Sequence, residues 1–321
     1  MKRLAVGVLA CVVATVALTG AAGAETRKKT ARKPPDYTTS VAWAAVPGPS
    51  LGVAQSIGGY AAGCIAGARA LPAEGVGYQV IRLSRQRNYG HPLLIDTLKD
   101  FGRKVAAAGL GTALIGDMGQ ARGGPMPMGH ASHQIGLDAD VWLRLDLPPM
   151  ARTARERLDE VKYVDYDRMT IGNGWSERQA RLVQIAASDP RVSRIFVNPA
   201  IKQAMCGRSW PDRSFLNKLR PWYGHDGHMH IRLSCPPGSP QCEDQAAQPE
   251  GDGCGEEVAS WLDRATPAVE RPHATPPKPR PPGPRVANVP PSCQAVLRAA
   301  GTRVASLPLD SLTDSAAPAT R

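Results

Sequence analysis

Five of the seven histidines in this 321-residue chain lie in two short segments that are far apart in the sequence. Residues 129–140 read GHASHQIGLDAD, and residues 224–232 read GHDGHMHIR. Histidines that serve only packing would be scattered along the chain. Neutral imidazoles with one carboxylate, and one position left for water, are the ligands of a catalytic zinc ion. The clustering therefore predicts a single metal site and a fold that brings the two segments together.

Both segments lead into alternating patterns that predict β-strands. In residues 137–145 the odd-numbered apolar side chains share one face, and the other face carries Asp138, Asp140, Trp142 and Arg144. In residues 228–233 apolar side chains alternate with His228, His230 and Arg232. We expect a carboxylate strand and a histidine strand that lie side by side and direct their polar groups at one point.

The spacing of His133 and Asp140 argues against a helix between them. Seven residues cover about 10 Å along a helix axis, which is too far for two ligands of one ion. Gly136 would instead allow a loop that returns His133 over the strand. His228 and His230 would stand roughly 6–7 Å apart at their Cα atoms. Both could bind the metal, or one could bind it while the other acts as a base.

The N-terminus predicts export. Lys2 and Arg3 precede an apolar run over residues 4–18, and small residues lead up to Ala24. This pattern is typical of a cleavable signal peptide, here over residues 1–24. No transmembrane anchor is expected after its removal.

The cysteines predict a disulfide framework. Six of the seven remain after removal of the signal peptide, and an even number in an exported chain favours disulfides. A metal cluster of cysteines is disfavoured because no C-x-x-C pair occurs. Cys235 and Cys242 enclose the turn-forming residues PPGSP and predict a small local loop.

Composition divides the chain into the signal peptide, a basic flexible linker over residues 25–40, a folded domain over 41–264 and a proline-rich tail over 265–321. Cys293 would tether the tail to the domain. The formal charge is +11, or +9 without Lys2 and Arg3. In an exported protein this excess favours anionic cell-envelope surfaces over nucleic acid, unless the charges only solubilise the linker and tail. The oligomeric state stays open.

The mixture of patterns in the domain predicts an α+β fold. Apolar residues recur at helical spacing from Leu94 to Val105, and a helix should end at Gly109. Residues 176–179 read SERQ, a capping box ahead of a second helix, and residues 194–197 form a strand candidate. We expect a small antiparallel sheet that carries the zinc site, flanked by helices and long loops and stapled by disulfides. The motifs H-E-x-x-H, S-x-x-K and G-x-S-x-G are absent, which excludes several common hydrolase sites.

Several motifs resemble those of the penicillin-insensitive murein endopeptidases. That family belongs to the zinc peptidases related to lysostaphin and the D-Ala-D-Ala carboxypeptidases. Besides the His133–Asp140 pair and the distant His-x-His, the resemblance rests on RLSRQRNYGHP at 82–92, RGGPMP at 122–127 and WYGHD at 222–226. It covers most of residues 45–264, including the cysteine pattern, but neither the basic linker nor the long tail.

The resemblance implies a function for specific residues. Zinc would be held by His133, Asp140 and His230, with His130 close by as a further ligand, and His228 and His225 would be the catalytic pair. We also expect Arg122 and Arg232 to bind the substrate. The implied disulfides are Cys64–Cys293, Cys206–Cys254 and Cys235–Cys242.

The implied reaction is hydrolysis of the D-alanyl–meso-diaminopimelate cross-link of peptidoglycan in the periplasm. His228 would accept a proton from the attacking water, while His225 or Arg232 would stabilise the oxyanion. Penicillin should not inhibit such an enzyme, because no acyl-enzyme serine takes part, whereas chelators should. Two alternatives are a zinc D,D-carboxypeptidase or dipeptidase acting on stem peptides, and a non-catalytic peptidoglycan-binding protein.

Overall fold

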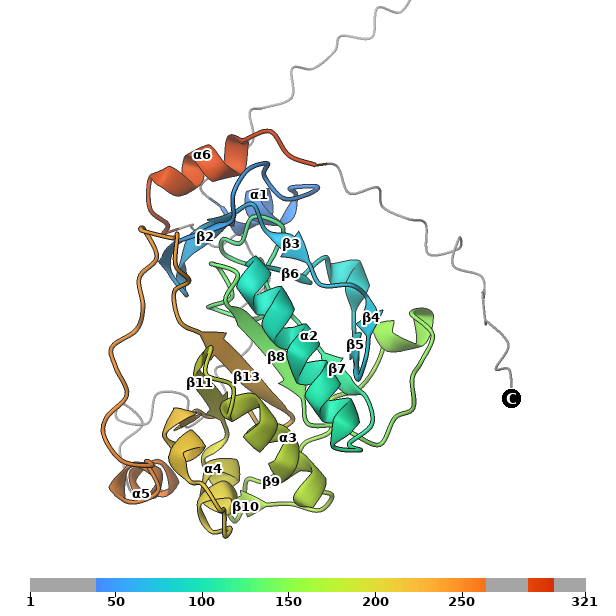
Figure 1. Ribbon diagram of the computed structural model, residues 1–321, viewed down its shortest axis with the longest axis vertical. Coiled ribbons are helices and arrows are strands. Elements are labelled where there is room, and N and C mark those ends of the chain that lie inside the picture. The colour runs from blue at the N-terminus through green and yellow to red at the C-terminus, as the bar shows by residue number, and fades with distance from the viewer. Residues whose placement is uncertain (1–38, 264–287, 303–321) are drawn as a thin grey trace, which may run out of the picture. The chain divides into compact units, whose positions relative to one another are not determined.

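The computed structural model describes residues 39–263 and 288–302. The predicted signal peptide, most of the basic linker and most of the proline-rich tail lie outside these ranges. The described chain combines a central β-sheet with helices and long loops, so the predicted α+β class is confirmed (Figure 1).

The central sheet has seven strands. Their order across the sheet is β12 (Leu219–Pro221), β11 (Val192–Val197), β13 (His228–Leu233), β8 (Asp138–Trp142), β7 (Ala113–Ile115), β5 (Tyr78–Val80) and β4 (Glu74–Gly75). The four middle strands β11, β13, β8 and β7 are antiparallel, as predicted. On each side a parallel pair extends them, β12 on β11 and β5 on β7.

Shorter strands form two-stranded ladders outside the central sheet. They are β1 (Gln55–Gly59) with β2 (Ala62–Ala66), β3 (Arg69–Ala70) with β6 (Tyr89–Gly90), and β9 (Val164–Asp165) with β10 (Thr170–Ile171). Three single 3₁₀ turns, η1 (Leu83–Arg85), η2 (Thr153–Glu156) and η3 (Ser214–Lys218), lie in the loops. The tip of the β1–β2 hairpin contributes Gly59, Tyr60 and Ala61 to a hollow beside the central sheet.

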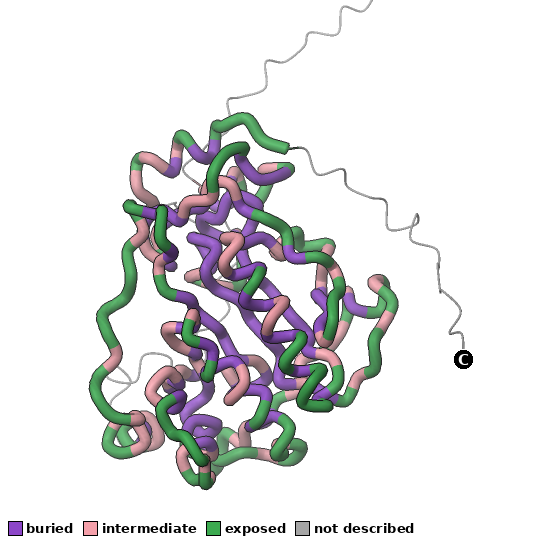
Figure 2. Tube along the Cα trace, viewed as in Figure 1, coloured by how far each residue is buried: buried purple, intermediate pink, exposed green. Residues whose placement is uncertain are grey.

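Helices α2 (Pro92–Ala107) and α3 (Glu177–Ala187) pack on one face of the sheet, the near face in Figure 1. The predicted helix over residues 94–105 is confirmed as α2, whose first turn is capped by His91 Nδ1 accepting the N–H of Leu93. The capping box of Ser176 and Gln179 is confirmed at the start of α3. Buried residues follow the central strands and the inner side of α2 (Figure 2).

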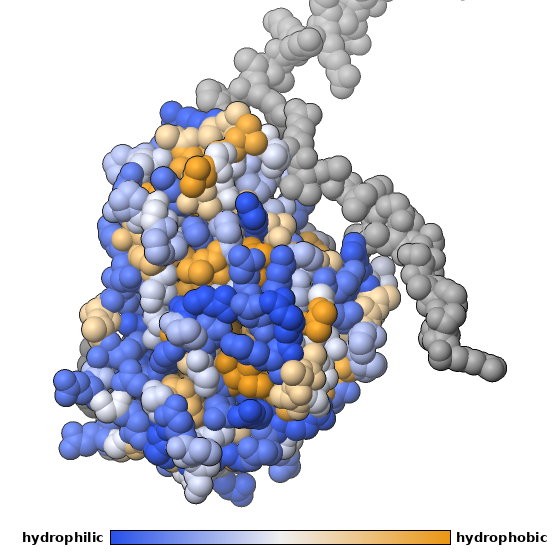
Figure 3. Space-filling view, viewed as in Figure 1, coloured by the Kyte–Doolittle hydropathy of each residue, from blue (hydrophilic) through white to orange (hydrophobic). Residues whose placement is uncertain are grey.

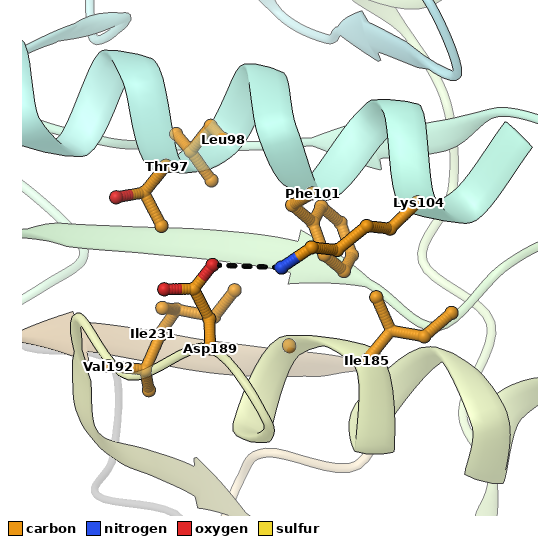
Figure 4. Close-up of a pocket in the computed structure, with 9 residues that line it drawn as sticks. Thr97, Leu98, Phe101, Lys104, Ile185, Asp189, Val192 and Ile231 are labelled. Carbon is orange, nitrogen blue, oxygen red and sulfur yellow. Dashed lines mark hydrogen bonds and ion pairs between the residues drawn. The ribbon is translucent and has the colours of Figure 1, made fainter. Parts of the chain in front are cut away.

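The cavity enclosed beneath the contact between α2 and α3 is too small for a ligand. Lys104 on α2 reaches across to Asp189, with 3.1 Å between Nζ and Oδ2, and the cavity beneath them has a volume of about 10 Å³ (Figure 4). That is about the minimum space for one water molecule. The clustered histidines lie on the opposite face of the sheet.

The remaining helices are α1 (Ser40–Ala44), α4 (Pro199–Cys206), α5 (Glu256–Leu262) and α6 (Ser292–Arg298). All three predicted disulfides are confirmed. Cys64–Cys293 ties α6 to β2, where Trp43 and Leu297 complete a small buried cluster. Part of the predicted tail is therefore folded against the domain, so the folded unit extends beyond residue 264, where the domain was predicted to end.

The surface offers no broad apolar face on the side shown in Figure 3, where hydrophobic residues form separate patches among polar ones. None of the helices in residues 39–263 and 288–302 is long and apolar enough to cross a membrane.

Candidate active site

Strands β8 and β13 bring the two histidine segments together. They pair in an antiparallel register that sets His230 opposite Asp140 and Arg232 opposite Asp138. Ala139 and Ile231 point into the core beneath α2, which leaves the carboxylates and imidazoles on the other face. The predicted pairing of a carboxylate strand with a histidine strand is confirmed.

The loop before β8 folds back as predicted. Gly136 has a φ of +73°, and His133 itself adopts a left-handed φ of 66°. Asp138 stabilises this backbone conformation, since its Oδ2 accepts the N–H of His133 at 2.9 Å. The imidazole of His133 consequently lies over β8 and is fully buried.

Three imidazoles surround the carboxylate of Asp140. Its Oδ1 lies 3.4 Å from His133 Nε2 and 3.4 Å from His230 Nδ1, and its Oδ2 lies 3.3 Å from His130 Nδ1. Four ligands at 2.0–2.1 Å from a tetrahedral zinc ion are about 3.3–3.4 Å from one another. Each of these three distances matches one edge of such a coordination shell. One ligand atom from each of His130, His133 and Asp140 lies within 4.8 Å of the other two, whereas His230 approaches from the Asp140 side alone.

The buried polar atoms of this cluster lack partners. Neither ring nitrogen of His133 nor Oδ1 of Asp140 makes a hydrogen bond. An unsatisfied polar group in a protein interior is costly unless another ligand completes it. A divalent cation bound by His133 Nε2 and Asp140 Oδ1, which lie 3.4 Å apart, would satisfy two of these three atoms, so the residues fit a metal ion.

Asp138 lies behind the cluster and is completely buried. Its carboxylate accepts hydrogen bonds from Arg232 Nε at 2.7 Å and Nη2 at 3.1 Å, and its Oδ1 lies 3.1 Å from His230 Nε2. Burial alone would raise the pKa of Asp138, but Arg232 and His230 outweigh it and hold the pKa well below its usual range. An ionised Asp138 holds the proton of His230 on Nε2 and leaves Nδ1 facing Asp140.

His228 and His225 lie beside the cluster. His228 Nδ1 is hydrogen-bonded to Glu160, and its Nε2 lies 3.8 Å from Asp140 Oδ2. Burial lowers the pKa of His228, but Asp140 and Glu160 raise it more, to about 9. The pKa of His225 is lowered well below its usual value by burial and by the neighbouring His228 and His230. Titratable groups whose pKa values are driven apart are typical of acid–base chemistry.

A hollow of about 600 Å³ opens next to these histidines. Its walls combine aromatic rings with charged side chains, among them Tyr60, Phe196, Trp222, Arg194 and Arg232. The guanidinium of Arg232 lies between two of these rings, 4.1 Å from the centre of Tyr60 and 5.1 Å from that of Phe196. The hollow has the size and lining of a peptide-binding site.

A family model described as penicillin-insensitive murein endopeptidase matches residues 56–298. The chain belongs to this family. The match runs from β1 to α6, and so it includes both histidine segments and all six cysteines of the disulfides.

Relatives with the same printed name agree with this membership. A penicillin-insensitive murein endopeptidase of Haemophilus influenzae is 47% identical over 231 residues, which cover 71% of this chain and 81% of the relative. Proteins of that name from Klebsiella pneumoniae and Salmonella typhi are 45% and 43% identical over 259 and 256 residues. Each of these two alignments covers 79% of this chain and 90% of the relative.

The structure places Arg122 away from the predicted substrate site. Its Nη1 donates to the carbonyls of Val296 at 2.7 Å and Leu297 at 2.8 Å, and its Nε donates to that of Gly48 at 3.1 Å. Arg122 thus holds α6 against the domain and is absent from the lining of the hollow. Its predicted role in substrate binding gains no support from this geometry.

Two carboxylates of this family member's site were missed by sequence reasoning. Glu160 comes from the long loop after β8, where no motif marks it. Asp117 follows β7; its Oδ2 lies 3.2 Å from His130 Nε2 and accepts hydrogen bonds from Arg85 and Arg87. Those two arginines belong to the RLSRQRNYGHP motif, which was the available signal for a buried anion nearby.

Proposed function

We propose that this chain is a zinc-dependent murein endopeptidase that hydrolyses the D-alanyl–meso-diaminopimelate cross-link of peptidoglycan. The observation that carries the proposal is the buried carboxylate of Asp140, with imidazole nitrogens of three histidines 3.3–3.4 Å away, in a chain that belongs to the murein endopeptidase family. The relatives' names supply the class of substrate, and the donor atoms supply the class of chemistry.

Zinc suits the donor set. His133, Asp140 and His230 would hold it, with His130 as a further ligand, and mixed imidazole and carboxylate ligands are those of catalytic zinc sites. When bound, the ion supplies a Lewis acid that polarises the scissile carbonyl and acidifies a water molecule. Asp138 and Asp117 support the site from behind, through contacts to His230 and His130.

His228 is the proton carrier in this proposal. Glu160 holds its Nδ1, so the ring is oriented with Nε2 toward Asp140 and the substrate side. A cation held by Asp140 would offset the carboxylate that raises the pKa of His228, so Nε2 would be free to take a proton from the attacking water and return it to the amine of the departing stem peptide. His225 is kept neutral by burial, and its Nδ1 lies 3.3 Å from the carbonyl oxygens of Trp222 and Tyr223, so its single N–H faces these oxygens and Nε2 is an acceptor. Arg232 would therefore be the group that stabilises the developing oxyanion.

We also propose that the protein acts in the periplasm. The pattern of a cleavable signal peptide over residues 1–24 supports export, and three disulfides suit an oxidising compartment. Cell fractionation and N-terminal sequencing of the mature protein test this part of the proposal. A cytoplasmic protein that keeps Met1 would contradict it.

The activity can be tested with a cross-linked muropeptide dimer and the purified mature protein, with products identified by mass spectrometry. We expect two monomers, formed in the presence of penicillin and lost after chelation, and restored by zinc. Loss of a single terminal D-alanine would instead identify a D,D-carboxypeptidase. If folded, zinc-loaded protein left the substrate intact, the result would favour the alternative of a non-catalytic peptidoglycan-binding protein.

A further inference from the structure

Two arginines face each other across the strands that form the floor of the hollow. Arg194 on β11 is directly opposite Arg232 on β13 in the antiparallel register, and both line the hollow. Like charges directly opposite each other destabilise a sheet. Arg232 is neutralised by the buried carboxylate of Asp138, whereas Arg194 makes no ion pair with any residue that the structure describes.

The guanidinium of Arg194 is also short of hydrogen-bond acceptors. Its Nη2 donates to the carbonyl of Ala246 at 2.7 Å, but its Nε is buried without a partner. Burial lowers the pKa of Arg194, and the nearby charges of Arg232 and Arg220 lower it further, whereas Tyr60 and Asp244 offset part of this change. Arg194 is half-buried and close to two other cations, and its buried Nε has no acceptor, so the guanidinium has room for an anion.

The nearby acidic groups do not supply that anion. Asp244 and Glu243 line the same hollow. Asp244 Oδ1 accepts hydrogen bonds from the Tyr60 hydroxyl at 2.8 Å and from the N–H of Cys235 at 2.9 Å, while Glu243 is exposed. Neither carboxylate forms an ion pair with Arg194 in the described chain, so Arg194 is open to an anion from outside it.

Arg194 lies on the strand next to the one that carries His230, two residues from the position paired with His230. Phe196, two residues further along β11, is paired with His230. Residues at i and i+2 on one strand face are about 6.5–7 Å apart. An arginine at this distance can reach a group attached close to a carbonyl bound beside His230.

We infer that Arg194 binds the substrate carboxylate next to the scissile amide. The inference rests on the proposed function, because the amide nitrogen of a D-alanyl–meso-diaminopimelate bond is attached to a carbon that also carries a free carboxylate. That carboxylate carbon lies within about 4 Å of the scissile carbonyl carbon. Arg194 thus gives the enzyme a preference for cross-links with this carboxylate free over those in which it is amidated.

The test compares two synthetic cross-linked dimers that differ only in this group, free carboxylate or carboxamide. We expect the wild-type protein to cleave the free acid with a kcat/KM about 10- to 100-fold higher, the effect of a charge-assisted hydrogen bond. Arg194→Gln should lose that preference by losing activity on the free acid alone, and Arg194→Lys should retain part of it. Arg103→Gln, an exposed arginine on α2, is the matched control and should behave as wild type.

Thermal unfolding separates recognition from a structural role. Because Arg194 opposes Arg232 without a counter-ion, Arg194→Gln should leave the Tm unchanged or raise it. Equal cleavage of both dimers by the wild type, or an equal loss on both with a lowered Tm in Arg194→Gln, would overturn the inference while the endopeptidase proposal stands. Failure of the zinc-loaded wild type to cleave either dimer would instead refute the proposed function and the inference with it.

Discussion

Asp138→Asn tests whether the metal cluster depends on the carboxylate behind it. Asp138 is completely buried and serves three partners: the guanidinium of Arg232, the Nε2 of His230 and the backbone N–H of His133. All three are donors. An amide of the same size must turn its own NH₂ group toward at least one of them, so one donor faces another and the negative charge is lost.

The size of the effect follows from these contacts. Removing one partner of a buried ion pair, here Asp138 with Arg232, costs about 3–5 kcal/mol in the free energy of unfolding. Loss of the carboxylate that orients a metal-binding histidine typically costs about 10- to 100-fold in metal affinity. Zinc affinity should therefore fall by about 1.4–2.7 kcal/mol in protein that is still folded.

Two measurements check this prediction. Urea unfolding of metal-free protein gives the stability, and competition with a chromophoric chelator gives the zinc affinity under conditions where the variant is folded. Asp146→Asn is the matched control, because Asp146 also pairs with an arginine but its side chain is 65% exposed, so the pair is worth less than about 1 kcal/mol. Unchanged zinc affinity in Asp138→Asn would refute the role assigned to Asp138 even if stability fell.

Three further predictions concern other parts of the chain. Glu160→Gln should lower kcat by about 10²-fold with zinc content unchanged, because His228 loses the group that orients it. Metal analysis and single-turnover kinetics check this prediction, and full activity of the variant would contradict it. Replacing Cys64 and Cys293 with alanine should lower the free energy of unfolding by up to about 5 kcal/mol, because the disulfide joins positions 229 residues apart. Urea unfolding measures this loss, and a loss smaller than about 1 kcal/mol would contradict the prediction. Burial lowers the pKa of Lys202 from 10.5 to about 8, so the folded state releases this proton before the unfolded state does. Stability relative to Lys202→Met should therefore rise between pH 8 and 10.5, by up to about 3 kcal/mol, and a difference independent of pH would contradict the assignment.

Much of the site could be predicted because its signals are local. The alternation of side chains in residues 137–145 and 228–233 assigned Asp140 and His230 to one face before the sheet was seen, and the register that pairs them is confirmed. The helix over residues 92–107 followed from helical spacing in the same way. A period of two or 3.6 residues is set by backbone geometry, so it can be read without knowing the fold.

The roles of the charged residues depended on the tertiary structure. Arg122 lies in a motif of the family, yet its guanidinium holds α6. Glu160 lies in no motif, yet it orients His228. The partner of a long charged side chain cannot be predicted from the local sequence, because it depends on which distant segment packs next to that side chain.

The sequence by itself therefore determined which candidate metal-binding side chains this protein carries, on which strand faces they lie, and which family it resembles. Only the tertiary structure decided which charges are neutralised and which have no counter-ion in the described chain. Arg232 is neutralised by Asp138, whereas the equally charged Arg194 faces a cation and an open hollow. The physical reason is that ionic and hydrogen-bond partners are fixed by contacts between segments far apart in the chain, which no local period encodes.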